Sequence, residues 1–557
     1  MTIIMYLCTG FSLVFSFLSF VPAFNAAAWA FPLTLIYSLV CFAAAFRLQQ
    51  KPDRQRLFLF RKLLEYLPFV LFAGFIIRRA TELECPFILD LFTVIVWLIV
   101  CVLSFFISFK LSDKRVTRIY PKMPAPPAGK KPIHIHLLEW VDALLQAACF
   151  VLIFQQFILQ LYAIPSESMV PEFMVGDRVA VIKTPSGPKF PLSDVGIPRM
   201  RSYGRGDIVV FSNPHYNDTK EARVLSFTHQ LVYMLTFTTV NINRDEFGRV
   251  KADPLVKRIT GIPGEKLMLV DGVLYSRRQG GEFVPVSEDA VWAMWDINSL
   301  PRSDRMLVQH LPMSKENFAL LESVESKRSD IDLDSAAAEA RGLVERFASL
   351  KISPDTIYST PELFSEQQRE LVYMFQSNDS ITKTLLTTNG GYNWFRDFMT
   401  AWINVPPRKN LFDEQSFHID LLLKLCMGKL IVRNAELLAA NSTIEQFATD
   451  GIRRSLLAEA DTYRFYMAWH DQRNFGEFPA GENDYIPENC FFMMGDNRFN
   501  SLDMRHSYTP RLTPIDSEDP YSFVYSSILA PKYVHADKIL GTAFFRFWPL
   551  SRAGVPH

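Results

Sequence analysis

The sequence predicts a multi-span α-helical membrane region followed by a mainly β domain, which a large and mostly helical insertion interrupts. Apolar residues crowd into the first 163 positions, and short β-branched runs bounded by Gly and Pro turns follow them. Farther along, apolar residues recur at helical spacing before strand character returns near the C-terminus. We therefore expect a membrane region at 1–163, the first part of the β domain at 164–275, the insertion at 276–484 and the second part of the β domain at 485–557.

The composition narrows the class of protein. Basic and acidic side chains number 58 each, so the balanced charge gives no indication of a nucleic-acid partner. Phe accounts for 47 residues and the mean hydropathy is slightly positive, which agrees with a chain that has membrane segments. The seven Cys form no CxxC pair, so neither a disulfide framework nor a structural zinc site is predicted.

Five apolar segments predict about five transmembrane helices. A crossing needs ~20 apolar residues, and most of the segments approach or exceed that length, whereas the third is short. No Lys or Arg precedes the first segment, so we interpret it as a span and not as a cleavable leader, although the small residues Ala26–Ala28 follow it. The segments are 3–22, 28–46, 63–77, 87–109 and 141–163.

The basic residues predict the orientation of these spans. Lys and Arg concentrate at 47–62 and at 110–131, and the positive-inside rule places both connections in the cytoplasm. The last span then carries the rest of the chain to the outer side, where Arg78 and Arg79 are a minor exception to the rule. The Pro-rich segment 121–132 is typical of a flexible linker. His134 and His136 follow that linker without further ligands, so they do not predict a metal site.

Short strands and tight turns predict a barrel-like or sheet-stacked β unit. The sequence Asp271-Gly272 is a hairpin signal between two of these runs. The predicted strands lie at 179–182, 208–211, 256–260, 266–270, 273–275, 491–494 and 539–547.

The insertion has a helical pattern. Apolar residues recur at helical spacing in 336–350 and again in 417–440. The sequence Ser442–Glu445 is typical of a capping box that opens a further helix. We find no catalytic signature in the insertion.

A loop just beyond the last apolar segment carries a candidate nucleophile. Pro165 and Pro171 favour an irregular, extended backbone on either side of Ser168, which could direct its hydroxyl toward a bound peptide. The alternative is a linker with incidental serines. No Gly-x-Ser-x-Gly elbow surrounds Ser168, and none of the histidines that could serve as a base lies in a recognisable setting: His215, His229, His470 and His506.

Lys257 is the more interesting candidate base. It lies on an apolar strand, where desolvation would lower the pKa of its ammonium from about 10.4 toward roughly 7–8. A neutral amine could then take the proton of a serine hydroxyl. The alternative is an ordinary exposed strand lysine.

Four motifs, in order after a membrane span, resemble those of the bacterial type I signal peptidases. They are Ser-Met-x-Pro from Ser168, Gly-Asp-Ile-Val-Val-Phe from Gly206, Lys-Arg-x-x-Gly-x-Pro-Gly from Lys257 and Gly-Asp-Asn-Arg-x-Asn-Ser-x-Asp-x-Arg from Gly495. The resemblance is confined to about 163–275 and 485–550.

The resemblance implies a signal-peptidase-like β fold and a Ser/Lys dyad serine endopeptidase that uses no metal or cofactor. Such an enzyme cleaves signal peptides from exported preproteins at the outer, periplasmic face of the inner membrane, and its substrates carry small residues at the −3 and −1 positions. Its implied partners are preprotein signal peptides, the lipid bilayer and the secretion machinery. The matching residues are Ser168 as nucleophile, Lys257 as general base, Ser166 as an oxyanion-hole donor, Ser501 as the residue that orients the lysine, and Asp503 with Arg505 as a structural ion pair.

Three features depart from the family pattern. Glu172 stands where the family usually has Thr, Phe499 and Met504 replace residues that are usually polar, and the insertion is atypically long. Two alternatives stay open: an inactive, membrane-anchored binding protein on the same fold, and a protease that its insertion dedicates to one class of substrate.

Overall fold

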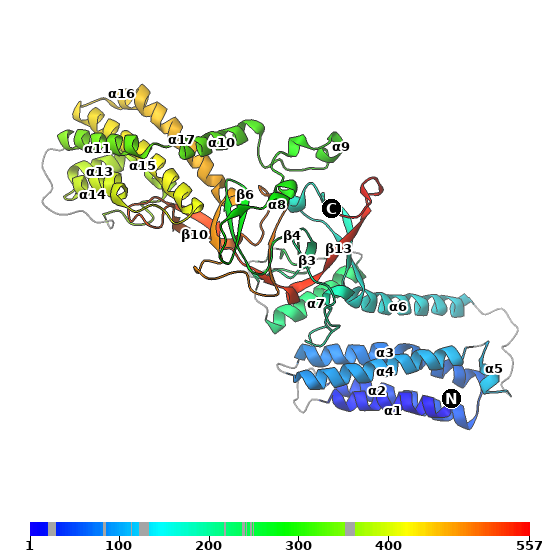
Figure 1. The fold of residues 1–557 in the computed structure, drawn as a ribbon. Helices are drawn as coiled ribbons and strands as arrows, with labels where there is room; N and C mark the ends of the chain where they lie inside the picture. The colour runs from blue at the N-terminus through cyan, green and yellow to red at the C-terminus, as the bar shows by residue number, and fades with distance from the viewer. Residues whose placement is uncertain are drawn as a thin grey trace.

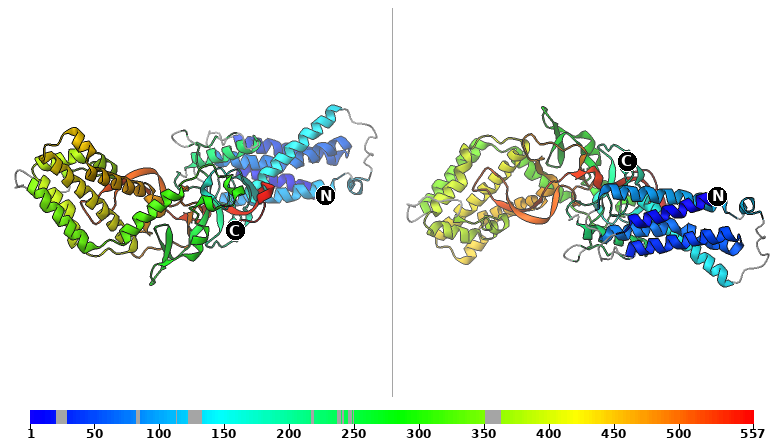
Figure 2. Two further views of the ribbon diagram at one scale, coloured as in Figure 1. Left: turned by 90° about the horizontal axis from the view of Figure 1, so that it is seen from above. Right: turned by 90° about the horizontal axis from the view of Figure 1, so that it is seen from below.

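The computed structural model describes residues 1–557 except 21–28, 82–84, 113, 122–132, 217–218, 237–239, 241, 245–247, 249 and 351–362. The molecule is elongated, with N-terminal helices at one end, β-strands in the middle and a helical lobe at the other end (Figures 1 and 2). Ala26–Ala28 and most of the predicted Pro-rich linker lie outside the described residues.

Four helices, α1 to α4, pack side by side as the N-terminal bundle, and α6 runs along α3 (Figure 1). Within the described residues, three helices are long and apolar enough to cross a membrane: α2, α4 and residues Ile135–Phe157 of α6. Helix α1 has 17 residues, and charged residues near both ends of α3 shorten its apolar stretch, so the predicted five spans are not confirmed. The bounds are Thr2–Leu18 (α1), Ala30–Gln50 (α2), Arg54–Thr81 (α3), Phe87–Lys110 (α4), Val116–Ile119 (α5) and Ile133–Phe157 (α6).

The last N-terminal helix ends at Phe157, and not at residue 163 as predicted. Strand β1 (Leu159–Ala163) follows and pairs antiparallel with β2 (Arg178–Ile182). Apolar residues continue through both the helix and the strand, so hydropathy alone does not separate them. Pairing with β2 ends the helix, because it supplies the hydrogen bonds of this segment from another part of the chain.

The larger sheet brings together strands from before and after the helical lobe. Its order is β1-β2-β13-β3-β4-β9-β12, and all neighbouring pairs are antiparallel. Arg258 of β4 lies opposite Met494 of β9, so the lobe leaves the sheet and the chain returns to complete it. Strands β3, β4, β9 and β13 coincide with predicted strands. The bounds are Ile208–Phe211 (β3), Leu255–Gly261 (β4), Cys490–Met494 (β9), Val534–His535 (β12) and Ile539–Trp548 (β13).

A second antiparallel sheet has the order β7-β6-β5-β8. Asp271 and Gly272 join β5 and β6 with φ values of 51° and 81°, as the hairpin prediction requires. Strand β8 lies inside the predicted insertion, because its four residues pair with β5 although they are too few for a clear sequence signal. The bounds are Glu265–Val270 (β5), Val273–Arg278 (β6), Val284–Pro285 (β7) and Phe475–Phe478 (β8).

One helix lies within the predicted first part of the β domain. Helix α7 (Lys220–Leu235) connects β3 toward β4, and the Thr219 hydroxyl accepts a hydrogen bond from the Ala222 N–H at its start (3.2 Å). The sequence analysis made no prediction for this segment.

The helical lobe consists of α10 to α17, and two of its helices coincide with predicted ones, α11 and α15. The capping box at the start of α16 joins Thr443 and Gln446, one residue later than the predicted pair Ser442 and Glu445. The bounds from α8 onward are Ser287–Trp292 (α8), Arg302–Arg305 (α9), Lys315–Ser329 (α10), Leu333–Leu350 (α11), Leu371–Gln376 (α12), Asn378–Thr387 (α13), Gly391–Thr400 (α14), Leu411–Ala439 (α15), Ile444–Thr449 (α16) and Gly451–Arg473 (α17).

A hairpin from the C-terminal part of the chain belongs to the core of this lobe. Strands β10 (His506–Pro514) and β11 (Val524–Leu529) reach the lobe in Figure 1. Phe523, just before β11, stacks on Phe375 with ring centroids 5.7 Å apart. The lobe and the β domain therefore share a core, which the sequence analysis did not predict.

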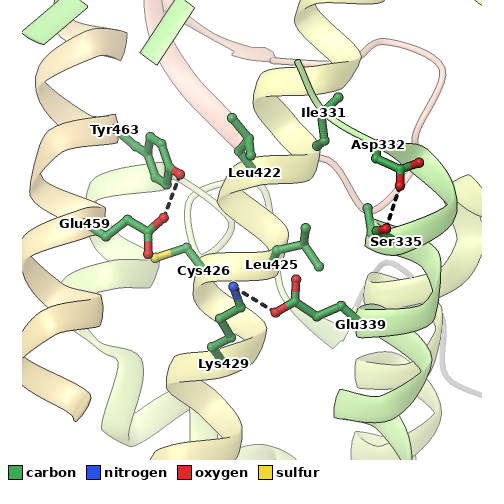
Figure 3. Close-up of a pocket in the computed structure, with 11 residues that line it drawn as sticks. Ile331, Asp332, Ser335, Glu339, Leu422, Leu425, Cys426, Lys429, Glu459 and Tyr463 are labelled. Atoms are coloured by element: carbon green, nitrogen blue, oxygen red, sulfur yellow. Dashed lines mark hydrogen bonds and ion pairs between the residues drawn. The ribbon is translucent and has the colours of Figure 1, made fainter. Parts of the chain in front are cut away.

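A pocket of about 240 Å³ opens between α11, α15 and α17 (Figure 3). Its charged groups already have partners, since Lys429 pairs with Glu339 at 2.8 Å and Tyr463 donates to Glu459 at 2.7 Å. None of the predicted site residues lines it.

Candidate active site

Ser168 lies in a short 3₁₀ turn, Glu167–Met169, a few residues after β1. The side chains of Met169 and Val170 are buried in the core, which fixes the turn on the sheet. Ser168 itself is 8% exposed, so little solvent reaches its hydroxyl.

The fold brings Lys257 to Ser168. Lys257 extends from β4, and its Nζ lies 2.5 Å from Ser168 Oγ. The lysine is 3% exposed, and burial lowers the pKa of its ammonium to about 8, although the charges of Asp503 and Asp496 oppose this shift. An amine with this pKa is partly neutral near pH 8 and can accept a proton from the hydroxyl beside it.

The loop Gly495–Arg505 closes the site from the other half of the chain. The Asn497 backbone N–H donates to the Ser168 carbonyl oxygen (3.1 Å), and its side-chain amide donates to the Glu167 carbonyl oxygen (3.1 Å). A Cβ at position 495 would lie 2.4 Å from the Ser168 carbonyl oxygen and 2.2 Å from Ser501 Oγ, so only glycine fits there. The loop therefore fixes Ser168 through the backbone of its turn.

Asp503 and Arg505 form a buried ion pair below the site. Arg505 Nε and Nη2 lie 2.9 and 3.0 Å from the two Asp503 carboxylate oxygens. Burial alone would raise the pKa of Asp503, but Arg505 holds it well below its usual range, so the carboxylate is charged. Its Oδ2 also accepts from the Ser501 hydroxyl (2.8 Å) and the Gly495 N–H (2.9 Å).

Ser501 was predicted to bond the lysine. Among the described residues its hydroxyl instead donates to Asp503, while the Lys257 amine contacts Ser168. Ser501 therefore has only an indirect link to Lys257. It donates to the Asp503 carboxylate, and the charge of that carboxylate raises the pKa of the Lys257 ammonium.

Ser166 lies at the exposed side of the site. Its Oγ lies 3.4 Å from Ser168 Oγ. An exposed hydroxyl at this distance can rotate toward a bound peptide carbonyl.

Two further ion pairs support the site, and the sequence analysis missed both. Arg258, next to Lys257 on β4, donates to both Asp496 carboxylate oxygens at 2.8 and 2.7 Å. Arg498 pairs with Asp289, which comes from α8. Asp496 and Arg498 belong to a motif that the sequence analysis recognised, but the sequence did not indicate which residues pair with them.

Of the histidines weighed in the sequence, His506 lies beside the ion pair, with its Nδ1 3.9 Å from an Asp503 carboxylate oxygen. The His506 ring, 3.0 Å from the Asp471 carbonyl oxygen, is buried, and burial lowers its pKa to about 4. In the part of the chain that the structure describes, no group of three or more His, Cys, Asp or Glu is arranged to hold a metal ion.

Glu167 is an unpredicted member of the site. Its side chain is buried at 4% exposure, and its carboxylate accepts the backbone N–H groups of Gln309 and His310, the latter at 3.1 Å. The Asn500 side chain donates to the same carboxylate at 3.3 Å. Residues 294–310, which we name the strap, thus bind the residue next to the nucleophile. The apolar residues Ile297 and Leu300 of the strap pack on Val170.

The departures from the family pattern have structural explanations. Glu172 pairs with Arg546 of β13 (3.5 Å), so its charge is compensated. Phe499 is 5% exposed and packs in the shared core against Phe318 of α10 and Trp469 of α17. Met504 is fully buried between strands. The loop that carries Ser501 thus faces the helical lobe, which favours an apolar residue at position 499.

Comparison with known proteins agrees with this geometry. A family model described as "Signal peptidase, peptidase S26" matches residues 137–291 and 432–548. The chain is 42% identical over 67 residues to "Signal peptidase I" of Buchnera aphidicola subsp. Schizaphis graminum, which covers 12% of this chain and 22% of the relative. It is 32% identical over 117 residues to "Signal peptidase I" of Buchnera aphidicola subsp. Baizongia pistaciae, which covers 21% of this chain and 27% of the relative.

Residues 137–291 and 432–548 contain all the predicted site residues and match the signal peptidase family. The chain spans about a quarter of the length of these curated relatives. Residues 292–431, which include the whole strap and much of the helical lobe, lie outside the family match.

Proposed function

We propose that this protein is a membrane-bound serine endopeptidase that cleaves signal peptides from exported preproteins. The observation that carries the proposal is the 2.5 Å contact between Ser168 Oγ and the buried Lys257 amine. In a chain that matches the signal peptidase family, this contact is the arrangement that a Ser/Lys dyad needs.

In the proposed reaction, neutral Lys257 takes the proton of the Ser168 hydroxyl as Oγ attacks the scissile carbonyl carbon. The carbonyl π electrons move to its oxygen, and the Ser168 N–H and the Ser166 hydroxyl stabilise this oxyanion. The lysine ammonium then donates its proton to the leaving amine as the peptide bond breaks, which leaves an ester on Ser168. Lys257 next deprotonates a water molecule that attacks the ester carbonyl carbon. The lysine ammonium then returns this proton to Ser168 Oγ as the ester bond breaks, and the signal peptide leaves with a new carboxylate.

The other site residues are proposed to position the dyad. The ion pair of Asp503 and Arg505 holds Ser501 and the Gly495 backbone beside the dyad. The Asp503 charge stabilises the Lys257 ammonium that forms during the reaction.

The proposed location is the inner membrane, as a multi-pass protein with the catalytic domain on the outer, periplasmic side. The basic residues at 47–62 and 110–131 support this orientation. The proposed partners are preprotein signal peptides, the lipid bilayer and the secretion machinery.

The test is cleavage of preproteins with small −3 and −1 residues by the purified full-length protein in lipid vesicles. We expect wild type to cut at the predicted position and Ser168→Ala and Lys257→Ala to show no measurable cleavage. Lys429→Ala is the matched control, because its side chain pairs with Glu339 in the helical lobe and contacts no predicted site residue (Figure 3). Failure of wild type to cut several such preproteins would favour the inactive binding protein on the same fold.

The second alternative is a protease for one class of substrate. The strap favours this alternative, because it lies outside the family match and binds Glu167, the residue before Ser168. Cleavage of one preprotein class and not of others by the wild-type enzyme would support that alternative.

A further inference from the structure

One loop of the β domain reaches the N-terminal bundle. We name residues 188–197, which lie between β2 and β3, the docking loop. The Phe190 side chain at its tip is 8% exposed and lies among aromatic rings of three helices. Its ring centroid lies 4.7 Å from Phe157 of α6, 5.6 Å from Trp97 of α4 and 5.9 Å from Phe75 of α3.

A buried charge cluster fixes the same loop. The Ser193 hydroxyl donates to Asp90 in the first turn of α4 at 2.5 Å, and Asp90 is 2% exposed. Asp90 also pairs with Arg78 and, at 3.2 Å, with Arg79, both in the last turn of α3. Arg79 donates in addition to the Leu192 carbonyl oxygen of the loop (3.1 Å).

This cluster explains the exception to the positive-inside pattern. Arg78 and Arg79 are the basic residues that the predicted topology places on the outer side. Both guanidinium groups pair with Asp90, and Arg79 also binds the docking loop. The two residues therefore stabilise the fold at this end of the bundle.

The docking loop also meets the end of α6. The Gln156 side chain donates to the Lys189 carbonyl oxygen at 2.8 Å. Helix α6 leads through β1 to Ser168, and the Thr184 hydroxyl also donates to the Phe157 carbonyl oxygen at the end of that helix (2.8 Å). The docking loop adds direct contacts with α3 and α4, so the bundle, the end of α6 and the β domain meet there.

We propose that the N-terminal bundle is a docking platform that holds Ser168 at a set height and orientation above the membrane, so that membrane-inserted substrates are cut efficiently. This inference rests on the proposed function. The substrate class is an apolar helix in the bilayer followed by an extended segment, and its scissile bond is held at one depth by its own membrane anchor. Both reaction partners are then fixed to the same membrane, and the docking loop removes the rotation that would take the nucleophile away from that bond.

The test compares two substrates on the full-length protein in lipid vesicles. One is a preprotein whose apolar segment is inserted in the vesicles, and the other is a short water-soluble peptide that spans only the cleavage site. Phe190→Ala should lower kcat/KM for the inserted preprotein by roughly tenfold, because a misplaced reacting group costs that order of rate. The same variant should cut the soluble peptide within about twofold of wild type, since diffusion lets that peptide reach Ser168 in any orientation.

Two further variants keep the test informative. Ser193→Ala removes one hydroxyl from the cluster and should give the same selective loss at a smaller size, even where Phe190→Ala folds poorly. Asp194→Ala is the matched control, because this residue of the same loop has a side chain 75% exposed and pairs only with the neighbouring Lys189 among the described contacts. It should leave both rates unchanged.

Equal losses on both substrates, or no loss on either, in both loop variants would overturn the inference. A wild-type protein that cuts neither substrate would instead refute the proposed function, so the two failures are distinct.

Discussion

Glu167 offers the sharpest test of how the strap acts on the nucleophile. Glu167→Ala removes a buried carboxylate that accepts hydrogen bonds from the Gln309 and His310 backbones and from the Asn500 side chain. The turn that carries Ser168 then loses its hydrogen bonds to the strap, while the packing of Val170 on Ile297 and Leu300 stays. We expect the protein to fold and the catalytic rate to fall.

The size of the effect follows from these contacts. A hydrogen bond to a charged group contributes ~1.5–3 kcal/mol, and each buried donor left without a partner costs ~1–3 kcal/mol. Part of this cost is relieved because Gln309 and His310 have exposed side chains and water can reach their backbone. If the displacement of Ser168 raises the activation free energy by ~1.4–2.7 kcal/mol, kcat/KM falls roughly tenfold to a hundredfold.

The assay is cleavage of a soluble peptide, with thermal unfolding measured in parallel. Gln309→Pro removes one of the two strap N–H groups that Glu167 accepts, whereas Gln309→Ala keeps both, so the first should lower the rate and the second should not. Combining Glu167→Ala with Gln309→Pro should cost no more than Glu167→Ala alone, because both break the same contact. A wild-type rate for Glu167→Ala, or fully additive losses in the double variant, would refute the role of the strap.

Four more predictions concern the dyad and its surroundings. Ser166→Ala should slow cleavage by about 3 kcal/mol, near a hundredfold, without abolishing it, and steady-state kinetics on the soluble peptide will check this. The kcat/KM of wild type should rise with pH through about 8, where Lys257 becomes neutral, and a flat profile between pH 6 and 9 would contradict it as the base. Because the folded pKa of about 8 lies below the unfolded value of about 10.4, burial of the ammonium costs about 3 kcal/mol below pH 8, and this cost disappears as the pH rises toward 10.4. Lys257→Met should therefore raise Tm at pH 7 by several degrees, which differential scanning calorimetry measures. Glu172→Thr should keep most of the activity and change the free energy of unfolding by less than ~1 kcal/mol in a urea titration, since it loses only a half-buried ion pair with Arg546.

Local patterns predicted the strands that carry the motifs. Strand β3 matches its predicted range, and β4, β9 and β13 differ from theirs by about one residue, because alternating or β-branched apolar runs end at Gly and Pro turns. Helices α11 and α15 were predicted because apolar residues recur along them at helical spacing, which is also a local pattern.

The misses share a physical cause. Strands β1 and β8 are short, and their identity depends on pairing with β2 and β5, which lie elsewhere in the chain. The hairpin β10–β11 belongs to the core of the helical lobe through Phe523, a contact that no local pattern records. Glu167 resembled an incidental linker residue because its partners Gln309 and His310 bind through their backbones, which carry no sequence signal.

The sequence by itself determined the chemistry that the chain can attempt. Ser168, Lys257 and the Gly495–Arg505 loop were identifiable from residue type, order and spacing, since a motif records which functional groups are present. Only the tertiary structure decided that Lys257 is buried 2.5 Å from Ser168, that Ser501 bonds Asp503, that the strap binds Glu167, and that the docking loop reaches the N-terminal bundle. Desolvation and hydrogen bonding act over a few ångströms in space, and those distances exist only after segments hundreds of residues apart have packed together.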